Sequence, residues 1–328
     1  MDATTRVLLD RIQRSFPIVP SPYLALSQGL GVSESDIREH LGKLKRQNLL
    51  RQISAIFNTG ALGYRSSLVA MAVPDSHLDR AVAVINSYPG VSHNYLRPGS
   101  YNIWFTIAVP PGRSLPETVN TIATAAGGWP TLILPALRKY KLAVVLDLLE
   151  EGEEAVTDEQ TKLPPTEPSV AFQSSARHIR VVRCIQEDLP LVERPFAVWA
   201  ASLAMTETDL LELIGTWLRH GTMRRFAAIL NHREVGFSAN GMVVWSCPPE
   251  EIDRYGTILA SHPEVSHCYH RPGYAEWPYN LYAMVHGRSI DDCEQAAKRL
   301  AQAIHRNDYR ILFSTREFKK IRLKLFWD

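Results

Sequence analysis

The sequence contains few cysteines and no long apolar run. Only four of its 328 residues are cysteines, and no pair has the Cys-x-x-Cys spacing of zinc sites and redox motifs. No apolar stretch reaches the roughly 18 residues that a membrane-spanning helix needs, and residues 1–14 lack the apolar segment of a signal peptide. These absences argue against a disulfide framework and a membrane partner, and they predict a cytoplasmic protein.

The chain also lacks an excess of charge of either sign. Its 36 Lys and Arg residues nearly balance its 34 Asp and Glu residues, which leaves a formal net charge of +2. Nucleic-acid-binding domains are usually strongly basic, so charge alone does not indicate a nucleic-acid partner. The hydrophobic content of 45% and the charged content of 21% are typical of globular proteins, and the length suffices for two sizeable cores.

What the sequence does contain is a long internal repeat. Residues 51–58 (RQISAIFN) match residues 224–231 (RRFAAILN). Residues 91–99 (VSHNYLRPG) match residues 265–273 (VSHCYHRPG), in the same order along the chain. So many ordered identities are not expected by chance, and they predict a tandem duplication.

Each repeat begins with helical periodicity and continues with alternating strands and helices. Gly31 followed by the N-cap pair Ser33 and Asp36 predicts a helix-turn-helix. The order strand, helix, strand, strand, helix, strand that follows is typical of a ferredoxin-like domain. The expected strands are 68–73, 91–97, 102–109 and 131–137, then 242–247, 265–271, 280–286 and 310–315. The expected helices between them are 75–87, 115–125, 250–261 and 290–305.

We therefore predict an α+β protein, a tandem repeat of a winged-helix (helix-turn-helix) segment and a ferredoxin-like βαββαβ domain. The acidic, Pro-rich and Ser-rich stretch between the halves predicts an exposed linker. The expected domains are a first helix-turn-helix over 1–50, a first ferredoxin-like domain over 51–149, a linker over 150–177, a degenerate helix-turn-helix over 178–223 and a second ferredoxin-like domain over 224–328.

This order of elements, with a connecting segment at residues 49–58, resembles the Lrp/AsnC architecture over nearly the whole chain, twice. Two motifs narrow the resemblance. One is residues 93–97 (HNYLR) followed by 101–105 (YNIWF), and the other is residues 267–272 (HCYHRP) followed by 277–282 (WPYNLY). Together they resemble the two subunit types of siroheme decarboxylase, fused in one polypeptide.

The resemblance implies a carboxy-lyase of tetrapyrrole biosynthesis. Such an enzyme removes the acetate carboxyl groups at positions 12 and 18 of siroheme and yields didecarboxysiroheme, which feeds heme d1 or an alternative heme route. The implied partner is siroheme itself, and no cofactor beyond this iron tetrapyrrole is implied. The electrons of the broken bond can delocalise into the macrocycle, so neither pyridoxal nor flavin is needed.

A substrate with eight carboxylates needs several arginines, because unpaired buried carboxylates are costly and Arg binds them with two hydrogen bonds. Arg97 and Arg271 are the preferred candidates, since each follows a His-x-Tyr sequence. Aromatic rings can stack on the macrocycle. The remaining expected substrate-binding residues are Arg51, Arg224, Arg225, Tyr95, Tyr269, Tyr101, Trp277 and Tyr279. Trp104 could also stack on the macrocycle, but core packing is the alternative for it. For the arginines outside the two loops the alternative is a surface charge.

Loss of CO2 leaves a carbon that must take up a proton, and histidine is suited to supply it near neutral pH. Strand alternation predicts that Val91, His93, Tyr95 and Arg97 share one face. The same pattern predicts a second such face, made of Val265, His267, Tyr269 and Arg271. For any one histidine a purely structural role is the alternative, but the repetition with Tyr and Arg favours a proton donor.

Two further histidines are candidates. His270 is expected on the opposite face of its strand, unless the following Pro-Gly turn redirects it. His232 has no histidine counterpart in the first half, where Thr59 stands. The sequence gives no metal site, but His232 or His270 could act as an axial ligand of the substrate iron.

The first alternative function is a DNA-binding regulator. The second helix of the first half carries four basic residues that could contact phosphates, namely Arg38, Lys43, Lys45 and Arg46. However, acidic residues occupy the start of that helix, and residues 206–217 of the second half hold three acids and no base. DNA binding is therefore disfavoured.

The second alternative is a non-catalytic tetrapyrrole carrier or sensor, which would share the arginines and not require the histidines.

Lrp-like ferredoxin domains pair through their sheets. A fused tandem is therefore expected to form an intrachain pseudodimer, and a further homodimer of the chain stays open.

Overall fold

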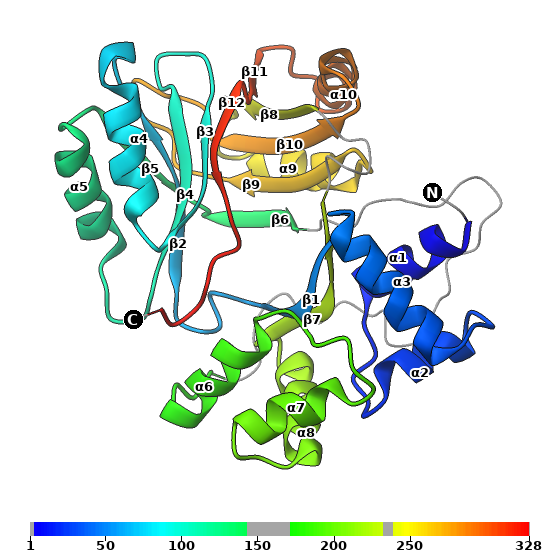
Figure 1. Ribbon diagram of the computed structural model, residues 1–328. Coiled ribbons are helices and arrows are strands. Elements are labelled where there is room, and N and C mark those ends of the chain that lie inside the picture. Colours follow the sequence, from blue (N-terminus) through cyan, green and yellow to red (C-terminus); the bar gives the residue numbers. More distant parts are fainter. Residues whose placement is uncertain (1–2, 143–170, 232–238, 328) are drawn as a thin grey trace. The chain divides into compact units, whose positions relative to one another are not determined.

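The computed structural model describes residues 3–142, 171–231 and 239–327 (Figure 1). The chain forms two compact units, and both halves of the repeat contribute to each. We call them the helical unit and the sheet unit. The helical unit comprises Met1–Tyr64, Val145–Val235 and Lys324–Asp328. The sheet unit comprises Arg65–Val144 and Gly236–Leu323.

The helical unit contains a helix-turn-helix from each half. Its helices are α1 (Ala3–Arg14), α2 (Pro22–Gln28), α3 (Glu34–Arg46), α6 (Ala176–Ile185), α7 (Pro195–Ser202) and α8 (Glu207–Arg219). The side chains of Ser33 and Asp36 form the predicted capping box at the start of α3, and Gly31 adopts a φ of +67° in the turn before it. Thr206 caps α8 in the corresponding way by accepting the amide of Asp209. The prediction of two helix-turn-helix segments is confirmed.

A two-stranded antiparallel sheet joins the two halves of the helical unit. It consists of β1 (Leu50–Phe57) and β7 (Met223–Leu230). Two reciprocal backbone hydrogen bonds extend this joint, from Phe16 N to Phe226 O (2.9 Å) and from Leu189 N to Ile53 O (2.8 Å). These strands pair with each other and not with the larger sheets. The unit boundary therefore lies at residue 64, whereas the sequence suggested a domain boundary at residue 50.

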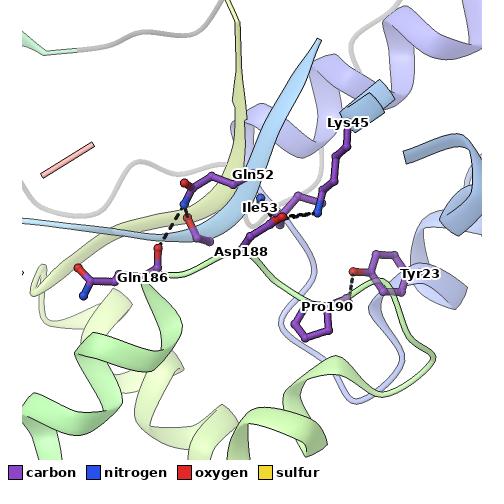
Figure 2. A network of polar contacts seen from close by, with 8 residues as sticks. Tyr23, Lys45, Gln52, Ile53, Gln186, Asp188 and Pro190 are labelled. Carbon is purple, nitrogen blue, oxygen red and sulfur yellow. Dashed lines mark hydrogen bonds and ion pairs between the residues drawn. The ribbon is translucent and has the colours of Figure 1, made fainter. Parts of the chain in front are cut away.

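Asp188 is the centre of a polar network within the helical unit (Figure 2). Its carboxylate accepts hydrogen bonds from Lys45 Nζ at 2.7 and 2.8 Å and from the Ile53 amide at 3.0 Å. Nearby, Gln52 donates to the Gln186 carbonyl, and Tyr23 OH donates to a further carbonyl of the same segment. The segment after α6 is thereby attached to α2, α3 and β1 of the other half.

The C-terminal segment also packs in the helical unit. The Gln186 side chain forms two hydrogen bonds with the backbone of Leu325, accepting from its amide at 2.7 Å and donating to its carbonyl at 3.2 Å. Tyr64 OH accepts the Phe326 amide at 2.5 Å, and the two rings lie 5.5 Å apart. The chain therefore returns to the helical unit after completing the sheet unit.

The sheet unit contains two five-stranded sheets. The first has the order β12-β3-β4-β2-β5 and the second has the order β11-β8-β10-β9-β6. The strands are β2 (Arg65–Met71), β3 (Val91–Leu96), β4 (Ile103–Val109), β5 (Thr131–Pro135), β6 (Arg138–Leu142), β8 (Ala239–Trp245), β9 (Val265–His270), β10 (Leu281–Gly287), β11 (Tyr309–Phe313) and β12 (Arg316–Lys320). The helices are α4 (Leu78–Ser87, after the short η1 at Asp75–His77), α5 (Leu115–Ala126), α9 (Ile252–Ser261) and α10 (Ile290–Ala303). The predicted βαββαβ order is present in both halves.

The two halves exchange their last strands. Strand β6 of the first half pairs with β9 of the second, with Arg138 opposite His270. Strand β12 of the second half pairs with β3 of the first, with Arg316 opposite Leu96. The exchange was not predicted, because residues 138–142 and 316–320 are mainly basic and show no apolar alternation. It realises the expected pairing of the two ferredoxin-like halves within one chain.

Three apolar cores stabilise the sheet unit. Helices α4 and α5 cover one face of the first sheet around Phe105, and α9 and α10 cover one face of the second sheet around Trp245. The third core combines residues of both halves, and its largest fully buried side chains are Trp104, Trp277 and Tyr282. Burial of such large aromatic surfaces is the main favourable contribution to packing.

The polar network around Asp188 leads to a stability prediction. Substitution Asp188→Ala removes the acceptor of the Ile53 amide and the partner of Lys45, so we expect the free energy of unfolding of the helical unit to fall by about 1–3 kcal/mol. Urea denaturation followed by circular dichroism measures the change. The matched control is Glu187→Ala, because Glu187 forms only an exposed ion pair with Lys324 and should contribute less than about 1 kcal/mol. Equal effects of the two substitutions would contradict the role of Asp188.

Candidate active site

A row of three side chains lies on one face of β3. The rings of His93 and Tyr95 are 6.2 Å apart, and the guanidinium of Arg97 lies 5.5 Å from the centre of the Tyr95 ring. His93 Nδ1 lies 2.9 Å from Ser92 Oγ, which also contacts Thr106 Oγ1 at 3.0 Å. The predicted row of His, Tyr and Arg on one face is therefore present in the first half.

The second half repeats this row on β9. The rings of His267 and Tyr269 are 6.1 Å apart, and the guanidinium of Arg271 lies 4.7 Å from the Tyr269 ring centre. Ser266 Oγ lies 2.9 Å from His267 Nδ1 and 2.8 Å from His286 Nε2. In both halves a serine hydroxyl thus contacts Nδ1 of the histidine, which orients the ring and directs Nε2 away from the hydroxyl.

Val91 and Val265 do not belong to these rows, and that part of the prediction is wrong. A shift of register between Val91 and His93 inserts one extra residue into β3, and a corresponding shift follows Val265 in β9. Both valines are fully buried in the helix-side cores. A β-bulge interrupts strict alternation, so the residues before and after it face opposite sides.

Arg97 and Arg271 are buried, and their expected role in binding substrate carboxylates stays a prediction. They are only 3% and 9% exposed, and their guanidinium groups donate to the backbone carbonyls of Leu312 and Leu134 respectively. Burial lowers the pKa of Arg97 to about 10 and also lowers the pKa of Arg271. Each arginine thereby connects its own half to the last core strand of the other half.

Most of the expected stacking aromatics pack against each other. Tyr101 and Trp277 are buried, and their rings form an edge-to-face pair at 6.0 Å. Trp277 Nε1 donates to Tyr282 OH, and its ring lies 4.8 Å from that of the half-buried Tyr279. Trp104 is 1% exposed, as the core-packing alternative requires. Tyr101 and Trp277 therefore offer no free ring face to a macrocycle in this structure, whereas Tyr95 and Tyr269 are only half-buried.

His270 lies apart from His267. It occupies the helix-side position at the end of β9, as strand alternation predicts, and its neighbour across the strands is Arg138. Burial lowers the pKa of His270, and the nearby charge of Asp253 partly opposes this shift. His232, the fourth histidine candidate, lies outside the described residues.

Three of the expected substrate arginines belong to the helical unit. Arg51 is exposed on β1, while Arg224 and Arg225 are half-buried on β7. Burial, together with the positive charge of Arg224, lowers the pKa of Arg225. The described residues place these arginines in a different unit from the two histidine rows. Their role in substrate binding stays a prediction.

The exchanged strands add charged residues that the sequence did not reveal as part of the site. Lys139 on β6 is the register partner of Tyr269, and Lys320 on β12 is the register partner of His93. Glu317 lies opposite Tyr95. His286 was also missed, because the first half has Ala108 at the equivalent position and the repeat therefore gave no signal.

Two of the basic residues on α3 form ion pairs within the helical unit. Lys45 binds Asp188 at 2.7 Å, and Arg38 lies 3.6 Å from Glu193. These contacts neutralise part of the charge that a DNA-binding helix would present. In the described part of the chain, no group of three His, Cys, Asp or Glu residues is arranged to hold a metal ion, and no helix has the length and apolarity to cross a membrane.

Comparisons with known proteins agree with this architecture. A family profile described as the AsnC-like ligand binding domain matches residues 61–141 and 234–319. A second profile, described as the siroheme decarboxylase NirDL-like HTH domain, matches residues 5–51 and 178–224. Both profiles match twice, once in each half, as the internal duplication predicts.

Individual relatives extend the match to nearly the whole chain. A siroheme decarboxylase of Hydrogenobacter thermophilus is 37% identical over 97% of this chain and 94% of its own length. A siroheme decarboxylase beta subunit of Desulfovibrio desulfuricans is 35% identical over 48% of this chain and 99% of its own length. The crystal structure of the siroheme decarboxylase NirDL with an iron-uroporphyrin III analogue superposes with a TM-score of 0.76, at 32% identity, and covers 99% of this chain and 95% of that chain.

The burial of Arg97 leads to a second stability prediction. Substitution Arg97→Ala leaves the Leu312 carbonyl without its donor inside the protein, so we expect a loss of about 2 kcal/mol in the free energy of unfolding of the sheet unit. Chemical denaturation measures it. The control Arg299→Ala removes an exposed arginine paired with Glu264 and should cost less than about 1 kcal/mol. An Arg97→Ala effect no larger than that of Arg299→Ala would refute the packing role.

Proposed function

The chain belongs to the siroheme decarboxylase family, and on that basis we propose that it removes acetate carboxyl groups of siroheme as CO2. One observation carries the proposal at the level of residues. A half-buried histidine stands beside a half-buried tyrosine on a sheet face, with its Nδ1 in contact with a serine hydroxyl, and this arrangement occurs in both halves. Each arrangement offers one proton donor.

The decarboxylation requires one proton transfer from the protein. The bond between the methylene carbon and the carboxylate breaks, CO2 leaves, and the electron pair delocalises into the macrocycle. A proton must then reach the methylene carbon to give a methyl group. We assign this transfer to Nε2 of His93 and His267, because their Nδ1 atoms contact Ser92 and Ser266.

The same proposal specifies the product and the residues that bind the substrate carboxylates. Removal of two acetate carboxyl groups, at positions 12 and 18, gives didecarboxysiroheme, and the macrocycle makes a further cofactor unnecessary. Lys139 and Lys320 are exposed on the strands next to the two rows, and we expect them to bind substrate carboxylates. Arg51, Arg224 and Arg225 of the helical unit are the further candidates for this role.

The second candidate function is a non-catalytic tetrapyrrole carrier, which would not need the histidines. The carrier would bind siroheme and release it unchanged. The experiment is anaerobic incubation of the purified protein with siroheme, followed by mass spectrometry of the tetrapyrrole. Loss of two CO2 per molecule supports the enzyme, unchanged bound siroheme supports the carrier, and absence of both binding and turnover refutes both functions.

Substitution of the row histidines is the matching test of mechanism. We expect His93→Ala and His267→Ala to lower the rate of at least one decarboxylation by about 10²–10⁴-fold, the usual contribution of a general acid. The matched control is His77→Ala, because His77 is exposed on η1 and contacts Ser76 Oγ at 3.0 Å and the ring of Trp129 at 5.1 Å, away from both rows. Full activity of both row variants would remove the histidines from the mechanism while leaving the activity of the wild type in place.

A further inference from the structure

The histidine row of the second half contains a hydrogen-bonded chain that leads to a second histidine. His286 Nε2 lies 2.8 Å from Ser266 Oγ, and Ser266 Oγ lies 2.9 Å from His267 Nδ1. Both distances are those of good hydrogen bonds. All three side chains are half-buried, and they come from the adjacent strands β9 and β10. The chain thus connects two imidazole rings through one hydroxyl group.

The serine hydroxyl gives this chain a direction. Ser266 has one proton to donate, and its acceptors are His267 Nδ1 at 2.9 Å and the Met284 carbonyl at 3.3 Å. The shorter contact favours donation to Nδ1, and Ser266 Oγ then accepts the proton of His286 Nε2. In this arrangement the proton of neutral His267 resides on Nε2, the nitrogen that faces away from the serine.

The first half lacks this connection. Ser92 contacts His93 in the same way, but its other side-chain partner is the hydroxyl of Thr106 at 3.0 Å. Ala108 occupies the position on β4 that corresponds to His286 on β10. An alanine side chain has no proton to transfer, so in the first half the contacts link Ser92, Thr106 and His93, whose Nδ1 lies 3.4 Å from Thr106 Oγ1.

The exchanged strands make the two rows differ in charge as well. Lys139 is the register partner of Tyr269 in the second row, whereas Glu317 is the register partner of Tyr95 in the first. Lys139 favours the approach of a substrate carboxylate to the second row, whereas in the first row Glu317 offsets the charge of Lys320, the register partner of His93. Both differences single out the second half.

We propose, on the basis of the proposed function, that His286 acts as a positioning and proton-supplying residue for His267 through the hydroxyl of Ser266. When CO2 leaves, the electron pair of the broken bond stays with the tetrapyrrole, and Nε2 of His267 gives its proton to the methylene carbon. Ser266 gives its hydroxyl proton to Nδ1 of His267 and receives one from the protonated His286. His267 is then neutral with its proton on Nδ1. Water protonates Nε2, and the proton on Nδ1 returns through Ser266 to His286, so one proton is consumed for each CO2 released.

The two halves are therefore inequivalent, and the second half is the one in which a relay supplies a proton to Nδ1 of the donor histidine as Nε2 gives up its own. Removal of His286 should slow one decarboxylation and cause the singly decarboxylated tetrapyrrole to accumulate. The binding of siroheme should change little, because His286 acts through Ser266 and does not contact the substrate. We therefore expect the substitution to lower kcat and to leave KM nearly unchanged.

The test measures both decarboxylation steps of the full-length protein with siroheme under anaerobic conditions. We expect His286→Ala to lower kcat of one step about tenfold or more, less than the loss of a direct donor, with KM unchanged within about twofold. His286→Gln keeps an N–H for Ser266 and guards against misfolding, and it should also be slow because an amide carries no transferable proton. Added imidazole should restore part of the rate of His286→Ala.

A double-mutant cycle separates the relay from a structural role. If His286 acts through Ser266, Ser266→Ala combined with His286→Ala should be no slower than Ser266→Ala alone. Additive losses, full activity of His286→Ala and His286→Gln, or failure of imidazole to rescue His286→Ala would each overturn the relay while the wild type still decarboxylates siroheme. A wild type that leaves siroheme intact would instead overturn the proposed function on which the relay rests.

Discussion

The exchange of β6 and β12 between the two halves is the constraint on which the sheet unit depends. Without this exchange, β3 and β9 would be edge strands with unpaired backbone groups, which are open to unwanted pairing. Each half covers the edge of the other, so neither ferredoxin-like half is complete by itself. The buried contacts of Arg97 with Leu312 and of Arg271 with Leu134 act in the same direction, because each joins one half to a core strand of the other.

The same exchange makes it possible for the two halves to diverge while the fold stays symmetric. The histidine rows lie on β3 and β9, the strands to which the exchanged strands pair. Row surroundings differ between the halves at equivalent positions: one row has Lys139 and His286, and the other has Glu317 and Ala108. These differences alter the surroundings of a row without disturbing its backbone. A gene duplication that keeps both frameworks can in this way specialise one site for proton delivery.

The sequence allowed much of the fold to be predicted and rather less of the site. The repeat motifs, the Ser33–Asp36 capping box and the strand–helix order determine the helix-turn-helix and ferredoxin-like halves, because they are local signals. The β-bulges at Ser92 and Ser266 were invisible, since an extra residue leaves no mark in the alternation of a short strand. The burial of Arg97 depends on a strand more than 200 residues away, which no local pattern reports. The sequence did not indicate His286, because the candidate residues were those repeated in both halves and the first half has Ala108 at this position.

Hydrogen–deuterium exchange of the backbone amides tests the strand exchange most directly, with peptides that cover residues 138–142 and 316–320. The exchanged strands are hydrogen-bonded to β9 and β3, so their amides that face these strands should be protected to the same degree as the amides of β9 and β3. Exchange as rapid as that of the exposed loop at residues 98–100, with β4 and β10 still protected, would show that the two halves do not complete each other's sheets.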